Sequence, residues 1–196
     1  MKKDIKLLNK EVMHDGFFNL NRYQLQHTLF AGGWSDVVSR ELFERGDAVA
    51  VLLYDPNADK VVIIEQFRIG AAVSQPDRAW MLEIVAGIIE KGETPEAVVH
   101  REAQEEAGCT IQTLEFISRF YVSPGGTSER IALYYGQIDA HNIGGVHGLV
   151  AEHEDIFVST VSADEAYQMV QDGRIESAIP IIAIQWLMLN KTRLTA

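Results

Sequence analysis

Hydrophobic and polar positions divide the chain into a weakly patterned first quarter and a strongly patterned remainder. Residues 1–46 read as short extended pieces, such as Glu11-Val12 and residues 23–26, broken by Asp15-Gly16 and Gly32-Gly33. Longer apolar runs begin immediately afterwards. The pattern places a domain boundary at Gly46, with a small antiparallel β domain over residues 1–46 and a main domain over residues 47–196.

The main domain opens with two apolar runs that predict strands. Residues 47–54 and 61–69 flank a polar turn, Asp55-Pro56-Asn57-Ala58-Asp59, and this spacing predicts a β-hairpin. Residues 80–89 predict a further buried strand, interrupted at Ala86-Gly87. Two more strands are expected over residues 116–121 and 131–138, and a glycine-rich loop over residues 142–154.

Capping signals mark the helices. Thr94 is a good N-cap, Pro95 suits the first helical position, and Gly108 is a natural stop after Ala107. A capping box over residues 162–165 predicts a second helix through Val170, and residues 179–190 predict an apolar last helix. Strands interleaved with helices favour an α+β chain whose main domain is an α/β/α sandwich around a mixed sheet.

Composition narrows the class of protein. The chain has 196 residues, 47 % of them hydrophobic and 23 % charged, which fits one main domain with a small accessory piece. No apolar run is long enough to span a bilayer, and no apolar stretch follows Met1-Lys2-Lys3, so we expect neither a transmembrane helix nor a secretory signal. The single cysteine, Cys109, favours a reducing cytoplasm.

The formal net charge of −11 argues against nucleic acid and anionic membranes as partners. An acidic protein that handles phosphates requires divalent cations as intermediaries. The place where such ions would bind is suggested by Glu102, Glu105 and Glu106, which share one face of the first predicted helix.

Like charges at that spacing, near the negative end of the helix dipole, destabilise a helix. A bound hard cation such as Mg²⁺ or Mn²⁺ would offset this cost. A solvated acidic face explains the three glutamates equally well. Val99, Ala103 and Ala107 form an adjacent stripe of small residues, which would let the helix pack tightly and hold the glutamates rigidly.

The surrounding residues resemble the Nudix box, G-x5-E-x7-R-E-U-x-E-E-x-G-U. Seven positions are in register: Gly87, Glu93, Arg101, Glu102, Glu105, Glu106 and Gly108. Ala103 and Cys109 depart from the bulky aliphatic residues at the two U positions. The resemblance implies a Nudix fold and hydrolysis of a nucleoside diphosphate linked to another group. It also implies that Glu102 and Glu106 bind metal, that Arg101 holds the carboxylates, and that Glu93 and Glu105 support the metal site.

Residues outside the box resemble the bacterial ADP-ribose pyrophosphatases within this family. The resemblance is carried by residues 16–18, 40–41, 43–46, 65–68, 123–130 and 147–149, with Glu152 and Glu154. It implies that the Ala86 carbonyl and Glu154 complete the metal site and that Glu152 is the general base. Gly144, Gly145 and Gly148 would then be hinges of a closing loop. An acidic, solvent-exposed loop is the alternative.

Arg45 and Arg68 are candidate diphosphate ligands because guanidinium groups pair with phosphate oxygens, although surface ion pairs would also explain them. By resemblance, Phe17 and Arg40 would contact adenine from the other subunit of a homodimer with shared active sites. Phe17 and Phe18 could equally belong to the core. The full set of candidate substrate-binding residues is Phe17, Phe18, Arg40, Glu41, Arg45, Arg68, Ile88, Ser123, Pro124, Gly125 and Glu129.

We therefore expect hydrolysis of ADP-ribose to AMP and ribose 5-phosphate, with two or three Mg²⁺ ions per site and Mn²⁺ as a possible substitute. Three alternatives remain at this level. The enzyme could act on an ADP-sugar, GDP-mannose or a dinucleotide, the chain could be a non-catalytic module that senses ADP-ribose, or the acidic helix could be structural.

Overall fold

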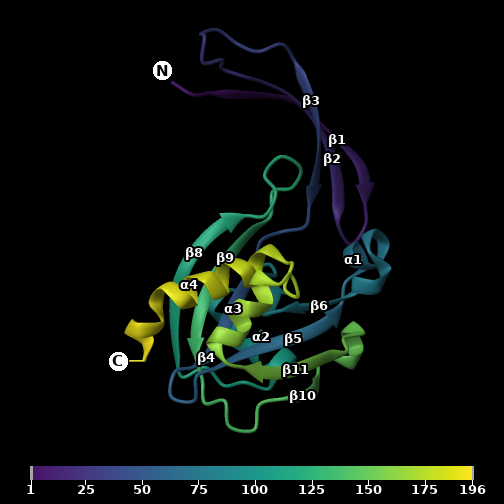
Figure 1. Ribbon diagram of the computed structural model, residues 1–196. Coiled ribbons are helices and arrows are strands. Elements are labelled where there is room, and N and C mark those ends of the chain that lie inside the picture. Colours follow the sequence, from purple (N-terminus) through teal and green to yellow (C-terminus); the bar gives the residue numbers. More distant parts are fainter. Residues whose placement is uncertain (1, 196) are drawn as a thin grey trace. The chain divides into compact units, whose positions relative to one another are not determined.

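The computed structural model describes residues 2–195, which divide into two units (Figure 1). The first unit comprises residues 2–47 and 121–130, and the second comprises residues 48–120 and 131–195. The segment 121–130 leaves the second unit between two of its strands, so the chain crosses between the units three times.

The first unit is a three-stranded antiparallel sheet in the order β1-β2-β3. Its strands are β1 (Ile5–Asp15), β2 (Asn19–His27) and β3 (Val38–Glu44). They are much longer than the short pieces expected from the sequence, although the predicted break at Asp15-Gly16 does separate β1 from β2. Every residue of β1 is exposed in this chain, so the sheet buries little apolar surface of its own.

The second unit is built on a mixed sheet. Its strands are β4 (Ala48–Asp55), β5 (Lys60–Phe67), β6 (Trp80–Glu83), β7 (Val85–Ile88), β8 (Thr113–Tyr121), β9 (Arg130–Gln137), β10 (Gly145–His147) and β11 (Ile156–Val161). The main path runs β10-β11-β5-β4-β9-β8, with β6 on β5 and β7 on β4. β4 is parallel to β9 and antiparallel to β5 and β7.

Helices cover both faces of this sheet, as expected from the sequence (Figure 1). They are α2 (Pro95–Ala107) on one face and α3 (Ala163–Gln171) and α4 (Ala178–Leu194) on the other. Alternate residues of β4 enter two separate cores: Leu52 packs with α3 and α4, whereas Val51 packs with α2. Burial on both faces explains why β4 reads as a continuous apolar run.

Local signals set the ends of the helices as predicted. Thr94 Oγ1 accepts the N–H of Ala97 at 3.3 Å, and Gly108 ends α2 in the left-handed conformation. Ser162 Oγ accepts the N–H of Glu165 at 3.1 Å at the start of α3. Val99, Ala103 and Ala107 are fully buried against the sheet, which confirms the small-residue stripe.

The structure corrects several predicted elements. The run 80–89 is two strands, separated at Ile84 rather than at Ala86-Gly87, because β6 pairs with β5 and β7 pairs with β4. The strand expected through residue 69 ends at Phe67 and is followed by α1 (Ile69–Ser74) and a 3-10 turn, η1 (Pro76–Arg78). β11 was not predicted, and α4 extends beyond both expected ends. Within residues 2–195, no helix combines the length and apolar character needed to cross a membrane.

Candidate active site

The C-terminal half of α2 faces β7 and brings two carboxylates into the interior. Glu102 and Glu106 are 9 % and 3 % exposed, which excludes a wholly solvated acidic face. The helix approaches β7 so closely that a Cβ atom at Gly87 would overlap the Glu102 carboxyl group. Gly87, the first glycine of the box motif, is therefore needed because a side chain would not fit there, and not because of its backbone conformation.

Glu106 is held by the backbone of β7. The Ala86 N–H donates to Glu106 Oε2 at 3.0 Å, so Ala86 lies directly beside this carboxylate. Burial raises the pKa of Glu106 to about 8, with further contributions from Glu102 and Glu154, against the opposing effects of the Ala86 N–H and Arg68. The ionised form of Glu106 is thus costly without a compensating positive charge.

Glu102 lies next to Arg101, whose Nη1 is 3.0 Å from Glu102 Oε1. Burial nevertheless raises the pKa of Glu102 to about 7, since the positive charge of Arg101 is opposed by nearby carboxylates. Those carboxylates are Glu105, Glu154 and Glu152, in decreasing order of effect. The loop acids therefore act electrostatically on the same helix face.

Arg101 links the acidic residues of the box. Besides Glu102, its guanidinium contacts Glu105 Oε2 at 2.9 Å and Glu93 Oε1 at 3.5 Å. Glu93 in turn accepts the N–H of Glu90 at 2.9 Å, which orders the turn before α2. Arg101 thus holds three carboxylates together, whereas Glu106 depends on the backbone of β7 instead.

The predicted glycine-rich loop contains β10 and a 3-10 turn, η2 (Val150–Glu152). Glu152, at the end of η2, is exposed. Glu154 is half-buried, and its Oε2 accepts the Leu149 N–H at 3.1 Å. An exposed carboxylate can accept a proton from water, whereas Glu154 is oriented by the backbone.

Arg68 is ion-paired rather than free. Its Nε and Nη2 lie 2.9 and 2.7 Å from Glu83 Oε2, and Gln66 Nε2 lies 3.4 Å from the same oxygen. Arg68 still lowers the pKa of Glu106, which places it within electrostatic range of the carboxylate pair. Ile88 ends β7 and is partly exposed.

The remaining candidates gather in the first unit. Phe17 is 88 % exposed and so is not core, while Phe18 packs edge-on against Phe17 and Phe43. Arg45 stacks over Phe18 at 5.0 Å and lies 3.1 Å from the carboxylate of Glu129, which is buried.

The segment around Ser123, Pro124 and Gly125 forms a tight turn, in which Ser123 O accepts the N–H groups of Gly126 and Thr127. Arg40 and Glu41 are both exposed on β3, and Glu41 pairs with Arg22 at 3.1 Å. The residues of the turn, together with Arg40 and Glu41, are exposed and accessible to a ligand.

The donor groups fit a hard divalent cation. Glu102 and Glu106 offer carboxylate oxygens, and the backbone of Ala86 lies beside Glu106. Because burial raises the pKa of both carboxyl groups, a bound cation would stabilise their ionised forms. Within residues 2–195, no three His, Cys, Asp or Glu side chains already stand in a metal-binding arrangement. The buried carboxylate pair is therefore a platform to which further ligands would be added.

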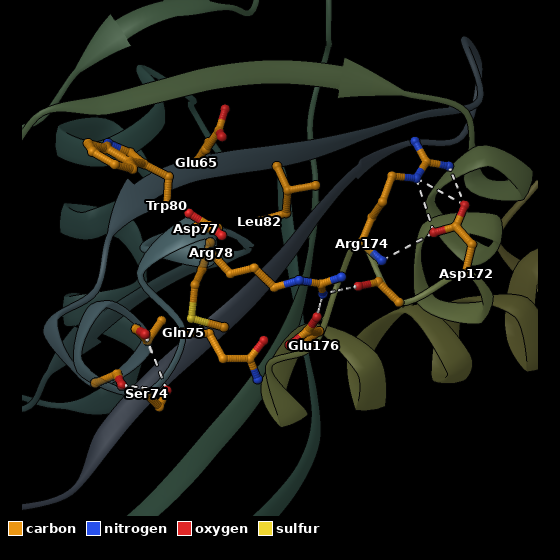
Figure 2. A pocket seen from close by; sticks show the side chains of 14 residues that line it. Glu65, Ser74, Gln75, Asp77, Arg78, Trp80, Leu82, Asp172, Arg174 and Glu176 are labelled. Atoms are coloured by element: carbon orange, nitrogen blue, oxygen red, sulfur yellow. Dashed lines mark hydrogen bonds and ion pairs between the residues drawn. The ribbon is translucent and has the colours of Figure 1, made fainter.

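A surface cavity of the second unit lies apart from these residues. It measures about 480 Å³ and is lined by residues from β5, α1, η1, β6 and the connection between α3 and α4 (Figure 2). Arg78 pairs there with Glu176, and Arg174 pairs with Asp172. None of the predicted site residues lines this cavity, so it does not mark the place of the chemistry.

One residue beside the site was missed from the sequence, and another was given no role of its own. Glu83 is the partner of Arg68, and the His147 ring lies against Gly108 at the end of α2. Glu83 is the last residue of β6 and belongs to no recognised motif. His147 was noticed only as part of a family resemblance.

Comparisons with known proteins identify the family to which the chain belongs. The model of the NUDIX domain family matches residues 44–180, and the chain belongs to the Nudix family. Its box residues build the carboxylate platform described above.

More specific relatives are the ADP-ribose pyrophosphatases of Haemophilus influenzae and Escherichia coli strain K12. They are 46 % and 47 % identical to this chain, which the alignments cover to 98 % and 96 %, together with 89 % and 90 % of the relatives. The GDP-mannose pyrophosphatase of Pectobacterium atrosepticum is 31 % identical, with 97 % of both chains covered. A crystal structure of an ADP compounds hydrolase shares the fold, with a TM-score of 0.73 at 18 % identity over 98 % and 97 % of the two chains.

Proposed function

We propose that this chain hydrolyses the diphosphate of ADP-ribose to AMP and ribose 5-phosphate with the help of Mg²⁺. The observation that carries the proposal is the buried pair Glu102 and Glu106, whose ionised forms are costly unless divalent cations are present. The near full-length similarity to ADP-ribose pyrophosphatases supports ADP-ribose as the substrate.

The cations would be held by Glu102, Glu106, Glu154 and the Ala86 carbonyl, with Glu105 supporting them through Arg101. We propose two or three Mg²⁺ ions, with Mn²⁺ as a substitute, because all of these donors are oxygen atoms. When bound, such ions neutralise the diphosphate charge and lower the pKa of the attacking water.

The chain's own groups supply the remaining chemistry. Glu152 accepts the proton of a water molecule that attacks one phosphorus, and the bond from that phosphorus to the bridging oxygen breaks. Arg68 would exchange its pairing with Glu83 for a phosphate oxygen, since both are anionic oxygen partners of a guanidinium group. Ile88, the partly exposed last residue of β7, would contact the substrate beside the phosphates.

We further propose a homodimer in which residues 1–46 complete the partner's site. In that arrangement Phe17 and Arg40 would contact the adenine, and Arg45 would bind the diphosphate together with Arg68. The other candidate substrate-binding residues are Phe18, Glu41, Ser123, Pro124, Gly125 and Glu129. The exposed β1 strand supports association, because its apolar side chains Ile5, Leu7 and Val12 are 71 %, 58 % and 60 % exposed. The buried, unpaired Cys109 is consistent with the cytoplasm.

GDP-mannose is the second candidate substrate, because GDP-mannose pyrophosphatases match the chain along nearly its full length. A panel of ADP-ribose, GDP-mannose, an ADP-sugar and a dinucleotide tests the two. We expect the highest kcat/KM for ADP-ribose, and no turnover when Mg²⁺ and Mn²⁺ are removed by a chelator. A higher kcat/KM for GDP-mannose would reverse the assignment.

Two variants separate metal chemistry from a structural acidic helix. Glu106→Gln should lower kcat by at least about a hundredfold, because a neutral amide neither binds a cation tightly nor keeps the charge of the pair. Glu96→Gln is the matched control on the same helix, where Glu96 accepts the Tyr134 hydroxyl at 2.9 Å. Equal activity of the two variants would favour the structural alternative. Hydrolysis in ¹⁸O-labelled water then identifies the phosphorus that is attacked.

A further inference from the structure

The loop that carries Glu152 and Glu154 is the connection of a β-hairpin. His147 at the end of β10 pairs with Ile156 at the start of β11, so residues 148–155 form the connection. The position of both glutamates therefore depends on what fixes this short segment at its base.

Gly148 ties the base of the loop to the end of α2. Its N–H donates to the carbonyl of Glu105 at 3.2 Å. Carbonyls in the last turn of a helix lack intrahelical partners, and the N–H groups of Gly108 and Cys109 serve those of Ala103 and Gln104. The loop thus supplies a hydrogen bond that the box helix needs, one residue before Glu106.

Gly148 also leaves room for Glu154. Its φ is +101°, and a Cβ atom there would lie 2.7 Å from Glu154 Cβ and 3.2 Å from the Glu154 carbonyl carbon. Glu154 occupies this space while its backbone N–H donates to Leu149 O at 3.2 Å and its Oε2 accepts the Leu149 N–H. The loop is folded back on itself at a point where only glycine fits.

The His147 side chain also contacts the end of α2. Its Nε2 lies 3.0 Å from Gly144 O, and its Cε1 lies 2.8 Å from where a Cβ of Gly108 would be. The ring therefore rests against the glycine that ends α2. Backbone and ring together fasten the loop to one helix terminus.

We propose that Gly148 and His147 are positioning residues that clamp the loop to the C-terminal end of α2 and so hold Glu154 and Glu152 in place for the reaction. The inference rests on the proposed function, in which these glutamates take part. It also changes the expectation that Gly148 is a hinge, because its N–H and its missing side chain are both used in fixed contacts. Gly145 is not a hinge either, because it pairs with Val158 between β10 and β11. A Cβ atom at Gly145 would meet no heavy atom of residues 2–195 within 4 Å beyond its chain neighbours, so this glycine makes no comparable contact.

Gly148→Ala and Gly145→Ala in the full chain form a matched pair. Both glycines have nearly the same φ, +101° and +98°, so alanine costs a similar amount of backbone strain at each. Only Gly148→Ala would displace Glu154. With ADP-ribose and Mg²⁺, we expect Gly148→Ala to lower kcat by about 10- to 100-fold, with KM for ADP-ribose within about threefold of wild type. It should also raise the Mg²⁺ concentration needed for half-maximal activity.

Gly145→Ala should keep kcat within about threefold of wild type, while the two variants have similar Tm values. Equal kcat values and equal Mg²⁺ requirements for the two variants would overturn the proposal. If wild type fails to hydrolyse ADP-ribose at all, the proposed function is wrong instead, so the two failures are distinguishable.

If Gly148→Ala does not fold, His147→Ala tests the same clamp. It removes the ring beside Gly108 without adding an atom near Glu154. We expect at least about a fivefold loss in kcat, and partial recovery in His147→Gln, whose amide nitrogen is as far from Cβ as His Nε2 and can still donate to Gly144 O. A kcat for His147→Ala equal to that of wild type would overturn the clamp.

Discussion

At the scale of single residues, Glu106 differs from the other glutamates of the site in the group that contacts its carboxylate. Arg101 contacts Glu93, Glu102 and Glu105, whereas Glu106 accepts the Ala86 N–H. The spacing of the glutamates along the helix could not reveal this difference, because it depends on which strand packs over the helix. The sequence placed the acids on one face, and the packing of β7 made two of them buried.

The raised pKa of Glu106 has a consequence for stability in the absence of divalent ions. The folded-state pKa of about 8 lies above the ordinary value of 4.5, so the folded chain binds a proton more readily than the unfolded chain. This contribution is fully present below pH 4.5 and is lost as the pH rises through 8. The Tm of the metal-free protein should therefore fall as the pH is raised from about 5 to about 8, and Mg²⁺ should oppose the fall by binding the ionised form.

Thermal unfolding of wild type and Glu106→Gln over this pH range measures the effect. Glutamine cannot ionise, so the variant should lose less Tm between about pH 5 and pH 8 than wild type does. Parallel curves for the two proteins would show that Glu106 does not titrate in this range.

At the scale of secondary structure, the sequence predicted elements well where their signals are local. The limits of α2 were correct because Thr94, Pro95 and Gly108 act through hydrogen bonds and backbone conformation within one turn. The break in the run 80–89 was misplaced, since it depends on the exchange of one partner strand for another. β11 went unpredicted although Ile156 and Val158 are buried, because the run is short and follows a polar loop.

The turn after β4 provides a test at this scale. Asp55 is 5 % exposed and accepts N–H groups from Asn57 and Ala58 in its own turn and from Ala140 at 2.9 Å. Burial would raise the pKa of Asp55, but these three donors outweigh it and hold the pKa below its ordinary value. Asp55→Ala should lower the free energy of unfolding by roughly 3 kcal/mol at neutral pH, because buried N–H groups lose their acceptor.

The stabilisation by Asp55 is present above the unfolded-state pKa and is lost as the pH falls through the folded-state pKa. Urea unfolding at about pH 7 and about pH 3 should therefore show a smaller difference between wild type and Asp55→Ala at the lower pH. Asp139→Ala is the control, since exposed Asp139 accepts the His141 N–H at 2.9 Å. If Asp139→Ala lowers the free energy of unfolding as much as Asp55→Ala does, Asp55 has no special role in stability.

At the scale of the whole molecule, the first unit leaves large apolar side chains exposed. Its β1 strand is exposed along its whole length, and Phe17 and Phe30 are 88 % and 86 % exposed. Surfaces of this kind in a folded protein are commonly binding surfaces. The proposed exchange of residues 1–46 between two subunits would use this surface.

Mixing two inactive variants tests the exchange directly. One variant, Glu106→Gln, lacks a working metal platform, and the other, Phe17→Ala/Arg40→Ala, lacks the proposed adenine contacts. If the arm of each subunit serves its partner, half of the randomly mixed dimers contain one intact site, and activity should reach about a quarter of the wild-type value. The assay is run with ADP-ribose below its KM, after the subunits have been allowed to exchange.

An arm that serves its own subunit predicts a different result. Every mixed dimer would then have one damaged component in each site, and mixing would restore no activity. Light scattering of each variant before mixing checks that both are dimers, and a monomeric wild-type protein would rule out the shared site.

The sequence by itself determined the family, the acidic helix with its caps, and the layered arrangement of the main domain, because these follow from short-range spacing and apolar periodicity. Tertiary structure alone decided which glutamates are buried, since burial of Glu102 and Glu106 requires β7 to lie against α2. It also decided that Arg68 pairs with Glu83 and that Gly148 holds the loop to the end of α2. These contacts join residues far apart in the chain, and their energies depend on distances and desolvation that no local pattern records.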